Sequence, residues 1–338
     1  MAEFQPRLEL QTVRGVACVL LVAYHVIGAD PTVGLRLPED SFWHQGMATF
    51  EFLRMPLFTI LSGYLYAVWR PGRGDLALFW QKKFRRIVLP LLFATLVTLV
   101  LRELVYGDRT AVLTAIFFHY QHFWFLQSLL VIFAVISLWD AFRPARWEAL
   151  CIAAFICLMF SRSFSLPSFL SLNGAAYLAP FFLFGMILRL EEGLLRNHSV
   201  IVIASWLLIV VTTLQQVGLA EMGQPIERTS LSAALCGASA GVVLLAKLPY
   251  SLILAKIGEA SYAIYLWHSI AGAAVRESLE GLGVPVAVLF VVLLLAGIAI
   301  PMGMRILLRS HAPASILLFG EMPRERLPNT ATAMTGPK

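Results

Sequence analysis

The sequence predicts an all-α integral membrane protein, a polytopic bundle of about ten transmembrane helices with both termini in the cytoplasm. Hydrophobic residues make up 59% of the chain and charged residues only 14%, well below the fraction of about 25% that is typical of soluble proteins. Apolar runs long enough to cross a bilayer recur along the chain. The connections between these runs are too short to hold a soluble domain.

Ten apolar segments qualify as predicted spans because each offers roughly 20 mostly apolar residues. They are residues 11–29, 48–69, 84–105, 121–141, 147–166, 173–190, 199–217, 228–246, 257–277 and 283–308. No small-residue cleavage site follows the first segment, so we expect it to remain as a membrane anchor. The membrane domain then covers residues 1–310. Residues 311–338, rich in Pro, Arg and Thr, are expected to form a cytoplasmic, flexible tail.

The positions of the basic residues set the predicted orientation. With the N-terminus inside, most of the 26 Lys and Arg residues lie on the cytoplasmic side, as the positive-inside rule requires. Because the basic residues sit in short clusters between apolar runs, the formal charge of +6 does not indicate a nucleic-acid partner. The four cysteines lie inside apolar stretches without metal-ligand spacing, so we expect neither disulfides nor a metal site.

The first predicted span carries an arginine and a histidine, Arg14 and His25. An eleven-residue separation on a helix corresponds to three turns plus about 20°, so both side chains share one face about 16 Å apart. Ionisable groups in spans are usually functional. This geometry suits a ligand with a charged head and a long arm, such as a coenzyme A thioester. The alternative is that Arg14 only marks the membrane boundary and His25 only packs.

Five short motifs follow one another along the chain. They are Arg14-x10-His25, Pro56–Phe58 with Leu61–Leu65, Lys82–Ile87 before Pro90, His122–Leu126, and Ile257–His268. In this order they resemble the R-x10-H, FF-x-x-SGYL, basic, h-x-WFL and IG-x-x-SY-x-IYLWH segments of the acyltransferase-3 family of membrane acyltransferases. The resemblance extends from residue 11 to about residue 270. It departs from the family in the basic motif, where R-x-x-R is common and this chain has Lys82–Arg85 and Lys83–Arg86.

The resemblance implies an O-acyltransferase of a bacterial inner membrane. Such an enzyme moves an acyl group, most often acetyl, from cytoplasmic acyl-CoA to a hydroxyl of an extracytoplasmic or lipid-linked saccharide. The donor is then acetyl-CoA or another acyl-CoA, and the acceptor is a saccharide or glycolipid. The identities of both the acyl group and the acceptor stay open. The alternative is a membrane transporter of an acyl donor or glycan intermediate, which should show internal repeats or paired broken helices that the sequence lacks.

The catalytic roles expected from this resemblance centre on His25. It is expected to act as general base toward the acceptor hydroxyl or to carry the acyl group itself, and the sequence does not separate these two routes. His268 should reach a similar depth in the membrane and converge on His25, unless it is a structural histidine. Glu51 is the first candidate for a carboxylate that orients the ring of His25, and Asp30 is the second.

The binding roles are expected at both ends of the bundle. Arg14 would hold the phosphates of the acyl-CoA, and Lys82, Lys83, Arg85 and Arg86 would add to this site. The alternative role of the four is contact with lipid headgroups. The expected substrate contacts are Trp124, His122, Tyr64 and Tyr265. Trp124 would stack on a sugar or belong to the aromatic belt, and His119 and His122 beside it would lie in water.

Overall fold

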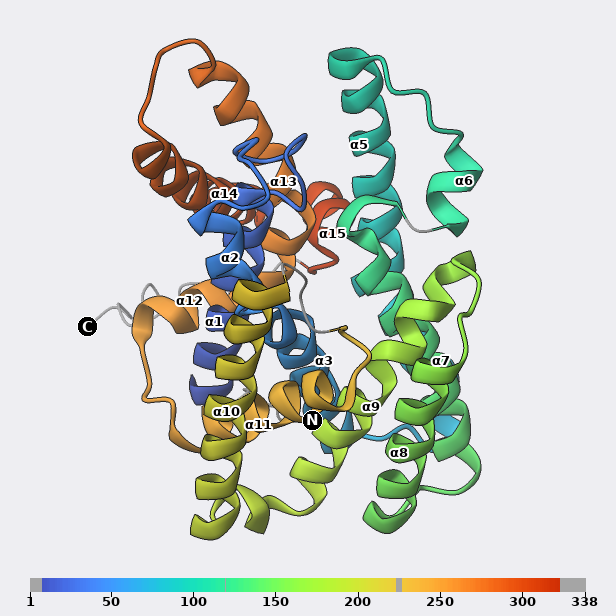
Figure 1. Cartoon of the computed structure of the whole chain (residues 1–338). Helices are drawn as coiled ribbons and strands as arrows, with labels where there is room; N and C mark the ends of the chain where they lie inside the picture. Colours follow the sequence, from blue (N-terminus) through green and yellow to red (C-terminus); the bar gives the residue numbers. More distant parts are fainter. Residues whose placement is uncertain (1–7, 119, 223–226, 323–338) are drawn as a thin grey trace, which may run out of the picture.

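The structure is a computed structural model that describes residues 8–118, 120–222 and 227–322. Within these ranges all regular secondary structure is helical, which confirms the predicted class. The helices, labelled in Figure 1, are α1 (Leu8–Ile27), α2 (Phe42–Ala48), α3 (Glu51–Val68), α4 (Leu76–Lys83), α5 (Leu89–Tyr106), α6 (Val112–Phe117), α7 (Trp124–Phe142), α8 (Trp147–Ser163), α9 (Leu172–Leu190), α10 (His198–Met222), α11 (Leu231–Lys247), α12 (Leu252–Glu259), α13 (Ser261–Leu279), α14 (Val286–Leu308) and α15 (Ala312–Phe319). Four short 3-10 segments, η1 (Arg73–Asp75), η3 (Gln121–Phe123), η4 (Phe169–Ser171) and η5 (Glu192–Leu195), and one π-helix, η2 (Phe84–Val88), complete the order.

Six helical segments in the described part of the chain are long and apolar enough to cross a membrane. They are Leu8–Ile27, Arg73–Tyr106, Val112–Phe142, Phe169–Leu190, His198–Gly218 and Val286–Leu308. The other four predicted spans fall on α3, α8, α11 and the α12–α13 pair, which are shorter or more polar. The chain is therefore an integral membrane protein, and the number of ten spans and the cytoplasmic termini remain predictions.

Burial separates central helices from peripheral ones. In the apolar 18-residue stretch of α1, 67% is buried inside the bundle, whereas the buried share of the corresponding stretch is 22% in α10 and 17% in α14. In Figure 1, α14 lies at the upper left of the view and α10 at the lower left. Their apolar side chains are exposed on the surface of the bundle. Exposure of so much apolar surface is unfavourable in water, so we expect lipid to cover these helices. The helix that carries Arg14 and His25 is thus one of the well-buried ones.

Glycines allow two pairs of central helices to cross closely. A Cβ atom on Gly63 of α3 would lie 1.9 Å from the carbonyl oxygen of Phe182 in α9, and one on Gly15 of α1 would lie 2.0 Å from that of Leu254 in α12. Neither position has room for a side chain, because backbone meets backbone there.

The predicted span 257–277 is divided in the structure. Helix α12 ends at Glu259 and α13 begins at Ser261, with Ala260 between them. Two hydrogen bonds fix α13 to its surroundings. The Tyr262 hydroxyl donates to the Ile87 carbonyl oxygen (3.1 Å), and the Trp267 indole donates to that of Leu318 (3.2 Å). The helix carrying His268 is therefore held by both η2 and α15.

The segment after residue 310 is ordered where the structure describes it. Residues 312–319 form α15, whose Ser315 and Phe319 are buried, so the expectation of a flexible tail from residue 311 is wrong for this helix. Gly320, with φ of +66°, ends α15 and lies against the backbone of Arg86. Residues 323–338, the rest of the predicted tail, lie outside the described residues.

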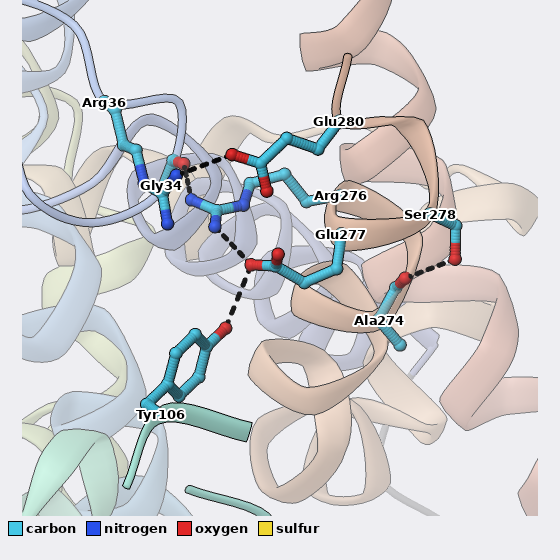
Figure 2. Close-up of polar contacts among 8 residues, drawn as sticks. All are labelled: Gly34, Arg36, Tyr106, Ala274, Arg276, Glu277, Ser278 and Glu280. Carbon is cyan, nitrogen blue, oxygen red and sulfur yellow. Dashed lines mark hydrogen bonds and ion pairs between the residues drawn. The ribbon is translucent and has the colours of Figure 1, made fainter. Parts of the chain in front are cut away.

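Polar contacts tie three segments together at the end of α13 (Figure 2). Arg276 donates to the Gly34 carbonyl oxygen (2.9 Å) and pairs with Glu277, which also accepts from the Tyr106 hydroxyl of α5 (3.0 Å). Arg36 pairs with Glu280 at 2.9 Å. The loop that follows His25 in the chain is thus fixed to α13.

Candidate active site

Three histidines from distant segments meet in the bundle. His25 lies in the last turn of α1, His122 in η3 and His268 in the middle of α13. The ring centroids of His25 and His122 each lie 4.8 Å from that of His268, and they are 5.6 Å from one another. The rings of His122 and His268 are buried and that of His25 is half-buried. We call these three residues the histidine cluster.

Backbone carbonyl groups fix the orientation of two of these rings. The Nδ1 atom of His25 lies 2.9 Å from the Leu21 carbonyl oxygen, and that of His268 lies 2.8 Å from the Ile264 carbonyl oxygen. A carbonyl oxygen only accepts hydrogen bonds, so each Nδ1 must carry the hydrogen. In a neutral imidazole the Nε2 atom then has a free lone pair. Both rings are therefore oriented to present a basic nitrogen to the cluster.

A serine hydroxyl connects the two buried rings. The Oγ atom of Ser269 lies 3.1 Å from Nε2 of His268 and 3.4 Å from Nδ1 of His122. A hydroxyl donates one hydrogen bond and accepts others, so it can bridge two imidazoles and move a proton between them. Ser269 was not a predicted site residue. Its signal in the sequence is a hydroxyl next to a histidine within an apolar span.

The position of His122 depends on local backbone strain and on α13. The preceding residue, Gln121, adopts a left-handed φ of 47°, which a side-chain-bearing residue rarely does. The Tyr265 hydroxyl donates a hydrogen bond to the His122 carbonyl oxygen. His122 is buried, so the expectation that it lies in water is wrong, and His119 lies outside the described residues. The Nε2 atom of His122 is buried without a hydrogen-bond partner among the described groups.

Neither predicted carboxylate orients the ring of His25 in the structure. Glu51, half-buried at the start of α3, makes no hydrogen bond to that ring in the described part of the chain, and the Leu21 carbonyl takes the expected role. Asp30 accepts hydrogen bonds from the backbone N–H and the hydroxyl of Thr32, at 2.8 and 2.5 Å. These bonds lower the pKa of the Asp30 carboxyl. A local backbone acceptor four residues away was sufficient, and so no carboxylate was needed.

Arg14 lies in the same unbroken helix as His25. The helical separation of about 16 Å along one face therefore applies to the folded protein. The side chain of Arg14 is half-buried, and its Nη1 atom donates to Oε1 of Gln11 at 3.3 Å. No ion pair involves Arg14 in the described part of the chain, so its charge is available to an anionic ligand.

The four predicted basic residues differ in what they contact. The Lys83 ammonium lies 3.5 Å from the ring centroid of Phe133, and that of Lys82 lies 5.2 Å from the ring of Trp69. Aromatic faces therefore already hold both lysine charges. Arg85 donates to the sulfur of Met322 (2.8 Å). Arg86 is exposed and belongs to η2, and π-helical turns of this kind are frequent at functional sites.

The aromatic residues expected to bind substrate fall into two places. Tyr265 and Trp124 lie beside the histidine cluster, Tyr265 through His122 and Trp124 two residues after it, half-buried. Tyr64 does not. It lies thirteen residues, or about 20 Å of helix, from the start of α3. Its hydroxyl donates to Glu192 (3.1 Å), and it lines a separate cavity of about 150 Å³ with Glu9, Arg196 and others.

No group of three or more His, Cys, Asp or Glu side chains within residues 8–118, 120–222 and 227–322 is placed to hold a metal ion. The cluster holds three imidazole rings, and the Ser269 hydroxyl bridges those of His122 and His268. This arrangement can accept a proton at one ring and pass it to another.

Comparison with known proteins covers the whole of this site. Residues 7–306 match a protein family that is described as an acyltransferase domain. The matched range contains Arg14, the basic segment and all three members of the histidine cluster. Neither a curated protein nor a solved structure matches the chain.

Proposed function

The chain belongs to the acyltransferase-3 family, and on this premise we propose that it is a membrane O-acyltransferase. It moves an acyl group, for which we propose acetyl, from cytoplasmic acyl-CoA to a hydroxyl of an extracytoplasmic or lipid-linked saccharide. We place it in a bacterial inner membrane with both termini in the cytoplasm. The observation that carries the proposal is the half-buried His25, whose Nε2 atom has no hydrogen-bond partner among the described residues and whose helix also carries Arg14.

The donor is proposed to lie along α1. Arg14 binds a phosphate of the acyl-CoA, and Arg86, the exposed arginine of the basic segment, adds a second contact. The pantetheine arm then runs along the helix toward His25, about 16 Å away. The arm that joins the diphosphate of coenzyme A to its thioester has a length of the same order. The thioester carbonyl thus arrives at the histidine cluster.

The reaction is proposed to begin at Nε2 of His25. This atom takes the proton of the acceptor hydroxyl as the hydroxyl oxygen attacks the thioester carbonyl carbon. A C–O bond forms, the C–S bond breaks, and the leaving thiolate receives the proton from His25. His268 and Ser269 lie on the same proton-transfer path. In the second route, Nε2 of His25 attacks the thioester carbonyl carbon, so that an N–C bond forms and the C–S bond breaks to release the thiolate. The acceptor hydroxyl oxygen then attacks the acyl carbon, the N–C bond breaks, and the hydroxyl proton passes to the thiolate.

A glycan analysis tests this proposal. Cells that express wild-type protein or His25→Gln, at equal abundance in the membrane, are compared by mass spectrometry of their surface glycan. We expect the acyl groups to disappear with His25→Gln. Arg109→Gln is the matched control, because Arg109 is exposed and, among the described residues, pairs only with the exposed Glu103. Normal acylation with His25→Gln would remove the enzymatic mechanism at this residue.

A second experiment separates the enzyme from the alternative transporter. A transporter of an acyl donor or a glycan intermediate does not form or break the thioester. Purified protein in nanodiscs, given acetyl-CoA and the extracted glycan, should release free coenzyme A thiol only if it is the enzyme. We expect thiol release with wild-type protein and none with His25→Gln.

A further inference from the structure

Arg54 in the first turn of α3 is a buried cation that the reaction described above does not use. Its side chain is only 8% exposed. The guanidinium carbon lies 3.5 Å from the ring centroid of Tyr24, so the planar group stacks on this ring. Its Nε atom is buried and has no hydrogen-bond partner within the described residues. A donor of fixed direction is thus left without an acceptor.

The charge of Arg54 lacks a close counter-ion. None of the ion pairs among the described residues includes it. Glu51, one turn earlier, acts on it electrostatically but lies beyond ion-pair distance. A buried, unpaired charge is strongly unfavourable, and proteins retain one chiefly where a ligand completes the pair. We therefore expect the guanidinium to bind an anionic oxygen of a ligand.

The location of Arg54 connects it with the histidine cluster. Tyr24, on which it stacks, directly precedes His25, and the two rings meet edge to face with centroids 5.1 Å apart. The charge of Arg54 also acts on His25. An anion that binds this guanidinium consequently lies next to the imidazole at which the acyl group would arrive.

We propose that Arg54 binds an anionic oxygen of the acyl group during transfer at His25. The inference rests on the function proposed above. When the acceptor hydroxyl attacks the thioester carbonyl carbon, the π electrons of that carbonyl move to its oxygen. The N–H groups of Arg54 stabilise this oxyanion until it re-forms the carbonyl and expels the thiolate. The same N–H groups fit the free carboxylate of a dicarboxylic acyl group such as succinyl.

Two variants and two donors test the inference. Membranes with wild-type protein, Arg54→Gln or Arg54→Lys receive radiolabelled acetyl-CoA or succinyl-CoA, and transfer into envelope saccharide is measured. Arg102→Gln is the matched control, since Arg102 is a half-exposed arginine that pairs with Asp108. Removal of one oxyanion donor lowers kcat by about 100- to 1000-fold. We expect such a loss with Arg54→Gln and a partial recovery of activity with Arg54→Lys. Arg102→Gln should transfer as well as wild type.

The two donors identify the oxygen. An equal loss with both donors, at little-changed KM, indicates the oxyanion. A loss confined to the succinyl donor, mainly in KM, indicates the carboxylate. The inference is overturned if Arg54→Gln transfers from both donors within about twofold of wild type at equal abundance. It is also overturned if Arg54→Lys accumulates normally but regains no activity over Arg54→Gln.

A further variant separates this inference from the proposed function. If wild-type membranes transfer acyl groups, His25→Gln membranes do not and Arg54→Gln membranes match wild type, then only the role of Arg54 is wrong. If His25→Gln membranes transfer as much as wild type, the mechanism at His25 is wrong, and if wild-type membranes transfer no more than membranes without the protein, the proposed function itself is wrong. Because Arg54→Lys keeps the charge over Tyr24, it also keeps the experiment decisive where Arg54→Gln does not accumulate.

Discussion

The carboxylate of Asp140, near the end of α7, joins α3 to the chain that follows α7. The side chain is 2% exposed. It accepts hydrogen bonds from Nε and Nη2 of Arg70 (2.8 and 2.5 Å), from the Tyr66 hydroxyl (3.0 Å) and from the Ala145 N–H (3.3 Å). Asp140→Asn changes the charge and one acceptor atom but almost no volume. Its effect therefore reports on this network alone.

The magnitude follows from burial. Removing one partner of a buried ion pair costs about 3–5 kcal/mol, since the other charge is left unpaired. We expect about 3 kcal/mol for Asp140→Asn, at the lower end, because Arg70 is 14% exposed and also donates to the Ala145 carbonyl oxygen. Asp108→Asn removes a carboxylate of a pair that is 34% exposed on each side. Its cost should be small, because solvent and salt screen an exposed pair.

Thermal unfolding in detergent measures both variants. We expect Asp140→Asn to lower Tm clearly and Asp108→Asn to leave it near the wild-type value. Replacing both partners, as Arg70→Met with Asp140→Leu, should be milder than Asp140→Leu alone, since no unpaired charge then remains. An Asp140→Asn protein with the Tm of the Asp108→Asn protein would refute the assignment of this network as a stabilising one.

Three further predictions concern the site and its support. Ser269→Ala should lower transfer by about tenfold or more and change its pH profile, whereas Ser269→Thr, which keeps the hydroxyl, should retain most of it; turnover measured across pH checks this. Gly63→Ala should lower the free energy of unfolding by about 1–3 kcal/mol, and Tm with it, because its Cβ would lie 1.9 Å from a backbone oxygen. Gly303→Ala, with open space around it, should leave Tm unchanged. Arg14→Ala should raise the Kd for acyl-CoA in a binding assay far more than that for the acceptor.

The sequence was sufficient to predict the helical class and the first helix, because both depend on local properties. The alternation of apolar runs with charged ends depends on composition alone. The shared face of Arg14 and His25 depends only on helical geometry, and α1 runs unbroken across both residues. The number of spans was less accessible. Helices such as α3, with Glu51 and Arg54 in its first turns, direct polar groups into the bundle, and composition does not distinguish them from partly membrane-inserted helices.

The remainder of the site depends on contacts between distant segments. The proximity of His25 and His268 was expected from depth and is present, but the burial of His122 depends on the left-handed Gln121 and on the Tyr265 hydroxyl from α13. No local pattern encodes such a contact. The expectation that a carboxylate orients His25 failed for the opposite reason. The acceptor is the helix's own carbonyl four residues earlier, which is available at every helical position and therefore leaves no mark in the sequence.

Arg54 shows how burial changes the meaning of a residue. In the sequence, Arg54 lies one turn after Glu51, a spacing that indicates an ordinary helical ion pair on a polar end. In the fold this end of α3 is covered, the pair does not form, and the guanidinium stacks on Tyr24 instead. A surface pair would have contributed little to stability, so its loss would need no explanation. A buried cation with an unbonded Nε does need one, and its position beside His25 gives the explanation in terms of the anionic oxygen that acyl transfer creates.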